Sequence, residues 1–145
     1  LDFIHSDRSI FKIVDLDEAW AFLNVAQGET LSNKLVRAGR AMNAGVYFVT
    51  QSSGDVSKES LKNNIGLKFA FRSTDTNEIK QTLEFFGLDS EDENNQKRLR
   101  DLENGQCLMQ DLYGRVGVVQ IHPVFVELLH AFDTRPPIKS EVDLE

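Results

Sequence analysis

Residues 10–20 read Ile-Phe-Lys-Ile-Val-Asp-Leu-Asp-Glu-Ala-Trp, and this stretch decides the fold. It is rich in β-branched and aromatic residues up to Leu16, and two adjacent carboxylates, a small residue and the only tryptophan of the chain follow. Such an apolar run predicts a buried strand of a parallel sheet. Lys12 and Asp15 interrupt the run, which a part-exposed strand, or one covered by something that this chain lacks, would explain.

The two carboxylates that follow this strand, Asp17 and Glu18, are the first candidate functional residues. Open α/β sheets bind ligands at the C-terminal ends of their strands, so both side chains are expected at such an edge. A nucleoside triphosphatase needs this pair, because the first carboxylate can hold Mg²⁺ and the second can polarise the attacking water. For the dipeptide alone, a strand that runs into a solvated acidic turn is the commoner explanation, so the other residues of the chain have to decide.

Composition and charge limit the class of protein. The 145 residues are enough for one domain with a buried core, and 41% hydrophobic and 27% charged residues are typical of a globular domain. The net charge of −7 argues against a broad surface for nucleic acid or acidic membrane, but not against contact through a few loop residues. Cys107 is the only cysteine, which excludes an intrachain disulfide framework and a cysteine-based zinc site and favours a reducing compartment.

The next long segment, residues 30–44, has the pattern of an amphipathic helix that ends at a glycine. Its apolar side chains recur at helical spacing and define one face that is expected to enter the core. Arg37 and Arg40 are three positions apart, and Arg40 lies roughly opposite the apolar stripe. Arg40 is therefore expected to project away from the core of its own subunit.

A second buried strand is predicted over residues 46–51, Val-Tyr-Phe-Val-Thr-Gln. Two strands that are joined by a helical crossover run parallel, and their C-terminal ends lie at the same edge of the sheet. Asp17, Glu18 and Gln51 are therefore expected to converge at one edge.

The second half of the chain is predicted to contain two capped helices. Residues 75–78 (Asp-Thr-Asn-Glu) and 90–93 (Ser-Glu-Asp-Glu) both resemble capping boxes, which mark helix starts. The first of these helices should stop at Gly87 and carry Ile79, Leu83 and Phe86 inward. A short helix over residues 57–64 is expected to precede them.

Strands are predicted over residues 67–72, 106–112 and 116–121. The last two are separated by Tyr-Gly-Arg, which predicts an antiparallel hairpin. A closing helix over residues 123–132 is expected to be anchored by its apolar side chains, namely Val124, Leu128 and Leu129.

Three motifs taken together point to a family: Asp-Glu-Ala-Trp at 17–20, Arg-Ala-Gly-Arg at 37–40 and Thr-Gln-Ser-Ser-Gly-Asp at 50–55. In this order and spacing they resemble the C-terminal half of a conjugative-transfer ATPase of type IV secretion systems. That is the VirB/TraC-like branch of the FtsK–HerA group of RecA-like motor ATPases. The resemblance reaches roughly to Pro136. No single motif is decisive, but the order, the spacing and the tryptophan are together fairly specific.

The resemblance implies an α/β fold: a partial RecA-like P-loop NTPase sheet, mostly parallel, flanked by helices and followed by an antiparallel hairpin. It assigns Asp17 as the acidic Walker B residue near Mg²⁺ and Glu18 as the base that polarises water. Gln51 becomes the residue that senses the γ-phosphate. Arg40 matches the arginine finger, which reaches the nucleotide of a neighbouring subunit and stabilises developing phosphoryl charge.

Other arginines are weaker candidates. Arg37 could take the place of Arg40 or contact the nucleotide. Arg115, like Arg72, could be a second sensor or a hairpin contact, and a plain structural role is the preferred interpretation for both. Together with Asp17, Arg37 and Arg115 make up the nucleotide-contacting set that the resemblance implies.

The chain departs from the family in one respect, because it contains no Gly-x-x-x-x-Gly-Lys-Ser/Thr motif. In a RecA-like ATPase this loop precedes Walker B, so residues 1–136 are expected to be the C-terminal part of the domain. Residues 137–145 would be a tail, of which the last two are vector-derived. Without the loop, we expect neither bound ATP or Mg²⁺ nor useful hydrolysis by this polypeptide alone.

The resemblance implies that the missing phosphate-loop strand would lie between strands 46–51 and 67–72. Its absence leaves two strand edges facing a gap, and exposed edges invite pairing. The chain is therefore expected either to close this gap or to pair with another copy.

The intact parent is expected to be a hexameric, ATP- and Mg²⁺-dependent motor at the cytoplasmic face of a membrane-bound conjugation apparatus. Its partners would be further copies of itself and other apparatus proteins. Two alternatives stay open. One is a DNA-translocating coupling protein of the same superfamily, which the acidic balance mildly disfavours, and the other is a non-enzymatic docking module with a motor-like fold.

Overall fold

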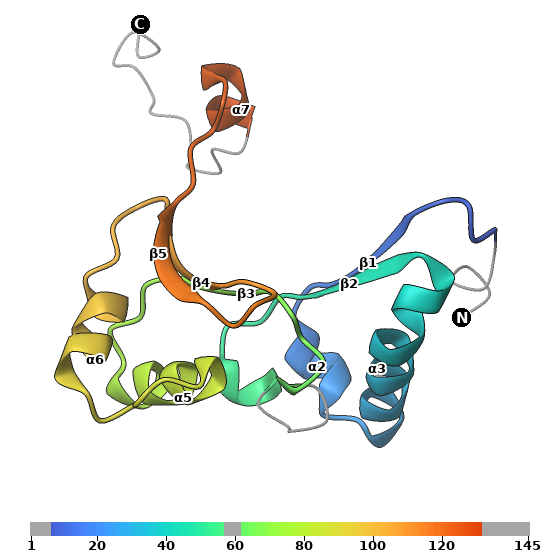
Figure 1. Cartoon of the computed structure of the whole chain (residues 1–145), viewed down its shortest axis with the longest axis horizontal. Helices are drawn as coiled ribbons and strands as arrows, with labels where there is room; N and C mark the ends of the chain where they lie inside the picture. Colours follow the sequence, from blue (N-terminus) through green and yellow to red (C-terminus); the bar gives the residue numbers. More distant parts are fainter. Residues whose placement is uncertain (1–6, 57–61, 132–145) are drawn as a thin grey trace, which may run out of the picture.

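The structure is a computed structural model that describes residues 7–56 and 62–131. It confirms the mixed α/β class, with a parallel pair β1–β2 and a separate antiparallel sheet of order β3-β4-β5 (Figure 1). The elements are β1 (Lys12–Leu16), α2 (Ala19–Leu23), α3 (Ala26–Gly39), the 3₁₀ turn η1 (Arg40–Met42), β2 (Ala44–Phe48), the 3₁₀ turn η2 (Ser53–Val56), β3 (Lys68–Ala70), α5 (Thr76–Phe86), α6 (Glu93–Arg100), β4 (Gln106–Gln110), β5 (Val116–Gln120) and α7 (Val126–Ala131).

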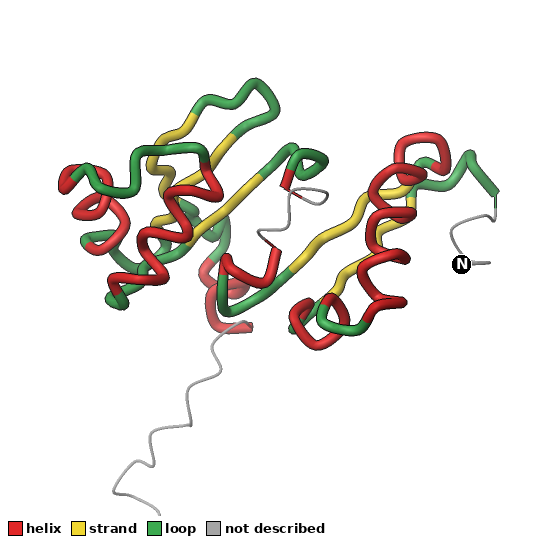
Figure 2. Tube along the Cα trace, turned by 90° about the horizontal axis from the view of Figure 1, so that it is seen from below, coloured by secondary structure: helices red, strands yellow, loops and turns green. Residues whose placement is uncertain are grey.

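Helices α2, α3, α5 and α6 lie on the same side of the strands, as the two perpendicular views in Figures 1 and 2 show. The buried apolar core forms between these helices and the strands, and α5 supplies more of it than any other described element. Its members are Ala19, Leu23, Ile79, Leu83, Phe85, Phe86, Leu99, Leu102 and Leu108.

The crossover from β1 to β2 runs through α2, α3 and η1, and β1 pairs with β2 in parallel as predicted. The predicted boundaries were shifted, since α3 ends at Gly39 and β2 begins at Ala44. A Cβ on Gly39 would lie only 2.7 Å from the carbonyl oxygen of Ala44, so the helix end and the strand start approach closely. Asn43 supplies the turn between them with a positive φ of 52°, a conformation that asparagine tolerates.

The prediction that residues 10–16 form a buried strand is wrong, and the alternative of a part-exposed strand is correct. Ile13 is 52% exposed, and Tyr47 of β2, which pairs with Asp15, is 55% exposed. Lys12 is instead only 4% exposed, because its ammonium group donates hydrogen bonds to the carbonyl oxygens of Asp7 (2.5 Å) and Ile10 (3.2 Å). Lys12 therefore faces inward, whereas Ile13 faces solvent.

The two sheets are not joined by strand pairing within the described residues. There, β2 pairs with β1 and β3 pairs with β4. The connection between the two sheets includes η2, which contacts both α2 and α5. The expected edges on either side of a gap are thus present, and this single chain does not close the gap by pairing β2 with β3.

Helix α5 begins and ends as predicted. The side chain of Asp75 accepts a hydrogen bond from the backbone N–H of Glu78 (2.8 Å), and the cap Gly87 has a left-handed φ of 74°. The inward-facing residues Ile79 and Leu83 are fully buried and Phe86 nearly so, which confirms that prediction.

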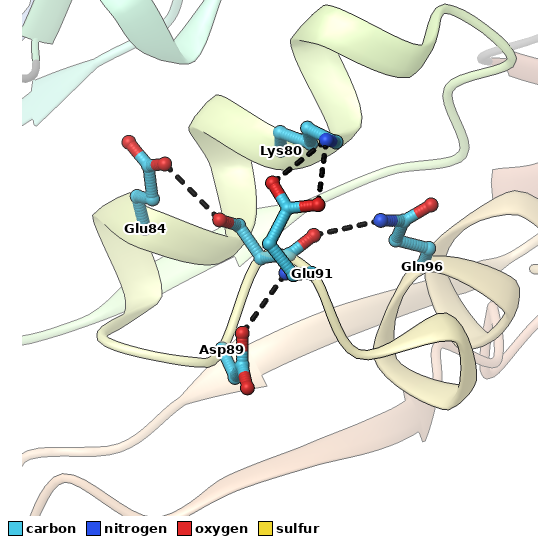
Figure 3. Close-up of polar contacts among 6 residues, drawn as sticks. Lys80, Glu84, Asp89, Glu91 and Gln96 are labelled. Carbon is cyan, nitrogen blue, oxygen red and sulfur yellow. Dashed lines mark hydrogen bonds and ion pairs between the residues drawn. The ribbon is translucent and has the colours of Figure 1, made fainter.

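The start of α6 differs from the prediction, because Asp92 rather than Ser90 caps the helix. The Ser90 hydroxyl donates instead to Glu84 of α5 (3.1 Å), and the Ser90 carbonyl accepts from Gln96 (2.7 Å) (Figure 3). Lys80 forms an ion pair with Glu91 at 2.7 Å beside these contacts. The 90–93 segment therefore ties α5 to α6.

The predicted hairpin is present as β4 and β5, with Cys107 fully buried in β4. The closing helix is shorter than predicted, and its expected anchors are wrong, since Val124, Leu128 and Leu129 are 79%, 42% and 56% exposed. The predicted helix over residues 57–64 falls mostly outside the described residues.

Candidate functional site at the ends of β1 and β2

The ends of β1 and β2 are aligned by backbone hydrogen bonds that continue beyond the strands. The N–H of Val49 donates to the carbonyl oxygen of Leu16 (3.0 Å), and the N–H of Ala19 donates to the carbonyl oxygen of Val49 (2.9 Å). Asp17 and Glu18 lie between these two contacts. Their backbone is therefore held at the edge where both strands end.

The side chains at this edge contact one another. The amide Nε2 of Gln51 donates to Oε1 of Glu18 at 2.8 Å, across 33 positions of sequence. Oδ1 of Asp17 accepts from the backbone N–H of Glu18 at 3.0 Å. All three residues are exposed. One carboxylate and one primary amide thus meet at an exposed edge, and the carboxylate of Asp17 lies next to them along the chain.

The backbone of Glu18 adopts a left-handed conformation, with φ = 50°. This conformation costs a residue with a Cβ roughly 1–2 kcal/mol relative to the right-handed region. It directs the chain from β1 into α2, where the carbonyl oxygen of Glu18 accepts from the N–H of Ala21 (3.0 Å). Such strain in a non-glycine residue is characteristic of functional sites.

The donor set at this edge fits Mg²⁺ and nucleotide only in part. Mg²⁺ prefers oxygen ligands and is usually held by one or two carboxylates, while substrate phosphates and waters complete its shell. Asp17 and Glu18 supply such oxygens. Within the described residues no group of three or more His, Cys, Asp or Glu gathers as a metal site. The two carboxylates therefore fit a magnesium ion whose other ligands are phosphate and water.

The two candidate arginines of the α3 end lie away from Glu18 and Gln51. Arg37 is exposed in the last turn of α3, and the backbone of Arg40 begins η1, directly before β2. This is the N-terminal end of the parallel pair, and a strand of five residues spans about 16 Å at ~3.3 Å per residue. The structure therefore does not bring Arg37 to the carboxylates of its own chain. The side chain of Arg40 lies outside the described part.

Arg115 has local partners. Its guanidinium contacts Oδ2 of Asp111 at 2.6 Å and lies 5.3 Å from the ring centroid of Tyr113. All three residues belong to the turn between β4 and β5. This geometry fits the structural role that the sequence favoured over a nucleotide contact.

One group of polar residues beside the site was missed by the sequence interpretation. The carboxylate of Glu78 in α5 accepts hydrogen bonds from Ser52 and Ser53, which directly follow Gln51. A glutamate at the third position of a helix is the signature of a capping box. The sequence therefore assigned Glu78 to helix capping and did not predict its contacts with the two serines.

No helix among the described residues is both long and apolar enough to cross a bilayer.

Comparisons with known proteins agree with this architecture. A family model described as an AAA-like domain matches residues 1–132. The chain is also 34% identical over 119 residues to "Uncharacterized protein YddE" of Bacillus subtilis (strain 168). This alignment covers 82% of the chain and 14% of that protein, so the chain corresponds to a small part of its relative. The match over residues 1–132 shows that the chain belongs to the AAA-like domain family, whose fold is of the ATPase type.

Proposed function

We propose that this chain is the C-terminal part of the ATPase domain of a conjugative-transfer or type IV secretion ATPase. The observation that carries the proposal is the 2.8 Å hydrogen bond between Gln51 and Glu18 at the shared edge of two parallel strands. It joins the residue that would polarise water to the residue that would sense the γ-phosphate.

In this proposal each side chain at the edge has one task. Asp17 holds Mg²⁺, directly or through water, and Glu18 orients and polarises the attacking water. Gln51 holds the Glu18 carboxylate and can exchange this contact for one with the terminal phosphate. Bound Mg²⁺–ATP supplies the phosphoryl group and the charge that neutralises its oxygens.

Arg40 would act on the nucleotide of a neighbouring subunit. The position of its backbone supports this, since η1 lies at the opposite end of β1–β2 from Glu18. A guanidinium supplied in trans stabilises the charge that develops on the transferred phosphoryl group. The active parent would then be an oligomer, which in the resembled family is a hexamer.

Because the chain covers 14% of the length of its relative, we also propose the activity and the partners of the whole protein. Its partners would be further copies of itself and other proteins of the apparatus, at the cytoplasmic side of the membrane. A DNA-translocating coupling protein is the main alternative. The net charge of −7 favours the secretion ATPase, and a DNA-binding assay over a range of salt concentrations would separate the two.

The direct test is the ATPase activity of the whole protein that contains this chain. Glu18→Gln keeps the shape of the side chain and removes its charge, and we expect kcat to fall by about 10²–10⁴-fold. Glu84→Gln is the matched control, because Glu84 is an exposed residue of α5 whose carboxylate accepts a hydrogen bond from Ser90. Unchanged turnover in Glu18→Gln would contradict the proposal.

The isolated chain provides a second check. We expect it to hydrolyse ATP at no useful rate, because it has no phosphate-binding loop. Turnover by the isolated chain that disappears in Glu18→Gln would refute this expectation.

A mixing experiment tests the action of Arg40 in trans. Whole-protein variants Arg40→Ala and Glu18→Gln should each be inactive, and mixed oligomers should regain part of the activity. Recovery is expected because some interfaces then combine an intact Glu18 with an intact Arg40 from the neighbour. The absence of recovery in oligomers shown to be mixed would place Arg40 outside the reaction.

A further inference from the structure

The carboxylate of Glu78 is the centre of a polar cluster that also contains Ser52, Ser53 and Thr82. Its Oε2 accepts from the Ser52 hydroxyl at 2.8 Å, and its Oε1 accepts from the Ser53 backbone N–H at 2.7 Å and from the Ser53 hydroxyl at 2.9 Å. The Thr82 hydroxyl, one turn further along α5, donates to the Ser53 hydroxyl at 3.1 Å and lies 3.4 Å from Oε1 of Glu78. Both carboxylate oxygens therefore hold the segment that follows β2.

The Glu78 carboxylate does not take part in helix capping. In a capping box, the glutamate at the third helical position reaches back to the backbone N–H of the cap residue. In this structure the N–H of the cap residue Asp75 donates to Ser73 at 3.3 Å, and Glu78 faces the segment after β2 instead. Asp75 still caps the N–H of Glu78. The helix start is thus satisfied without the Glu78 carboxylate.

The segment that Glu78 holds is the one that carries Gln51. Ser52 and Ser53 directly follow Gln51, whose amide donates to Glu18. Hydrogen bonds to a charged acceptor are roughly twice as strong as neutral ones, and the carboxylate accepts three of them from these two serines. A continuous set of contacts therefore links α5, in one half of the molecule, to the carboxylate edge in the other.

We propose that Glu78 is a positioning residue that fixes the loop after β2 and thereby keeps Gln51 against Glu18. Its catalytic consequence rests on the proposed ATPase function. The side chain itself does not touch the reacting groups in this proposal. Its charge holds the backbone of Ser53, two residues from Gln51, and the buried Thr82 supports the same serine.

The test compares three variants. Glu78→Ala removes all of the acceptors, whereas Glu78→Gln keeps the shape and one carbonyl oxygen and should retain part of the effect. Glu84→Ala removes another carboxylate from the same helix, where it contacts the Ser90 hydroxyl and not the loop after β2, and serves as the control.

Two readouts separate positioning from plain stability. In the isolated chain, NMR follows hydrogen exchange of the Ser53 N–H and the side-chain amide signals of Gln51. In the whole protein, steady-state kinetics give kcat and KM for ATP. Glu78→Ala should accelerate Ser53 exchange by about tenfold or more and shift the Gln51 signals. It should lower kcat by about ten- to a hundredfold with little change in KM. Glu78→Gln should lie between Glu78→Ala and wild type, and Glu84→Ala should match wild type.

The possible results are distinguishable. Unchanged Ser53 exchange and Gln51 signals in a folded Glu78→Ala variant would overturn the proposal, as would an unchanged kcat in an active whole protein. A wild-type whole protein without ATPase activity would refute the proposed function, and the NMR readouts alone would then decide whether Glu78 positions Gln51. A melting temperature of Glu78→Ala equal to that of Glu84→Ala would show that the effects do not come from unfolding.

Discussion

The two halves of the molecule differ in how their strands are supported. The half built from β3 to β5, α5 and α6 supplies most of the buried apolar core, with Leu83 and Leu99 fully buried. In the other half, the described residues of β1 and β2 contribute no fully buried apolar side chain, and the buried member of β1 is Lys12. Leu16 and Phe48 reach the core only in part.

The candidate site belongs to the less buried half. Asp17, Glu18 and Gln51 are all exposed, and they are held by backbone contacts, by one another and by the loop that Glu78 fixes. Most of the core residues and the candidate functional residues therefore lie in different halves of the molecule. One half provides most of the packed core, and the other presents the polar groups at the ends of β1 and β2.

The largest expected effect is on the core. Leu83→Ala should lower the free energy of unfolding by about 2–5 kcal/mol, because it opens a cavity at a fully buried position. Ile13→Ala, at an exposed position of β1, should cost less than about 1 kcal/mol. Urea denaturation of both variants checks this. Equal losses in the free energy of unfolding would show that both halves contribute equally to stability.

A second test uses the left-handed residue in each half. Gly87, with φ = 74°, ends α5, and Gly87→Ala should cost about 1 kcal/mol of stability. Glu18, with φ = 50°, occupies the equivalent backbone region at the site. Glu18→Gly should therefore leave the melting temperature unchanged or raise it, while it abolishes ATPase activity in the whole protein. A large loss of stability in Glu18→Gly would mean that Glu18 is a structural residue.

A third test concerns the buried Lys68 of β3. Its ammonium group donates to the carbonyl oxygen of Phe85 at 2.9 Å, and burial, together with the charge of Lys62, lowers the pKa of Lys68 below 10.5. The unfolded chain then binds this proton more tightly than the folded chain. The free energy of unfolding should therefore rise with pH, from the folded-state pKa up to 10.5.

Lys68→Met should remove that contribution to the pH dependence, whereas Lys97→Met, on the exposed face of α6, should keep it. Urea denaturation of the three proteins between about pH 8 and about pH 10 measures the slopes. Equal slopes in all three would show that Lys68 does not titrate differently on folding.

The smallest effect is expected for Arg115→Ala. Arg115 contacts Asp111 and Tyr113 within its own turn and is 77% exposed, so the variant should change kcat and KM of the whole protein by less than about twofold. A marked rise in KM for ATP would restore Arg115 to the set of nucleotide contacts and would extend the site into the other half.

The sequence predicted best what local pattern alone determines. The start of α5 at Asp75, its end at Gly87 and its inward face were all correct, because caps and helical spacing act over a few residues. The parallel pairing of β1 with β2 followed from the crossover rule, and the contact between Glu18 and Gln51 lies at the edge where that rule places both strand ends.

What the sequence missed depends on contacts between distant residues. Lys12 is the exception, since the carbonyl oxygens that accept hydrogen bonds from its ammonium group are only five and two positions upstream, but a period-two pattern does not encode such bonds. Val124, Leu128 and Leu129 looked like helix anchors, although the described residues do not bury them. Glu78 matched a capping box, but its partners lie more than twenty positions upstream. Composition and local spacing do not predict such contacts.

The most direct test of the account is a double-mutant cycle on kcat in the whole protein, with Glu18→Gln, Gln51→Ala and both together. If the two side chains act as one unit, the double variant should be about as slow as Glu18→Gln alone, since the second change removes nothing further. Two independent losses that multiply in the double variant would contradict the claim that the ends of β1 and β2 form one catalytic edge.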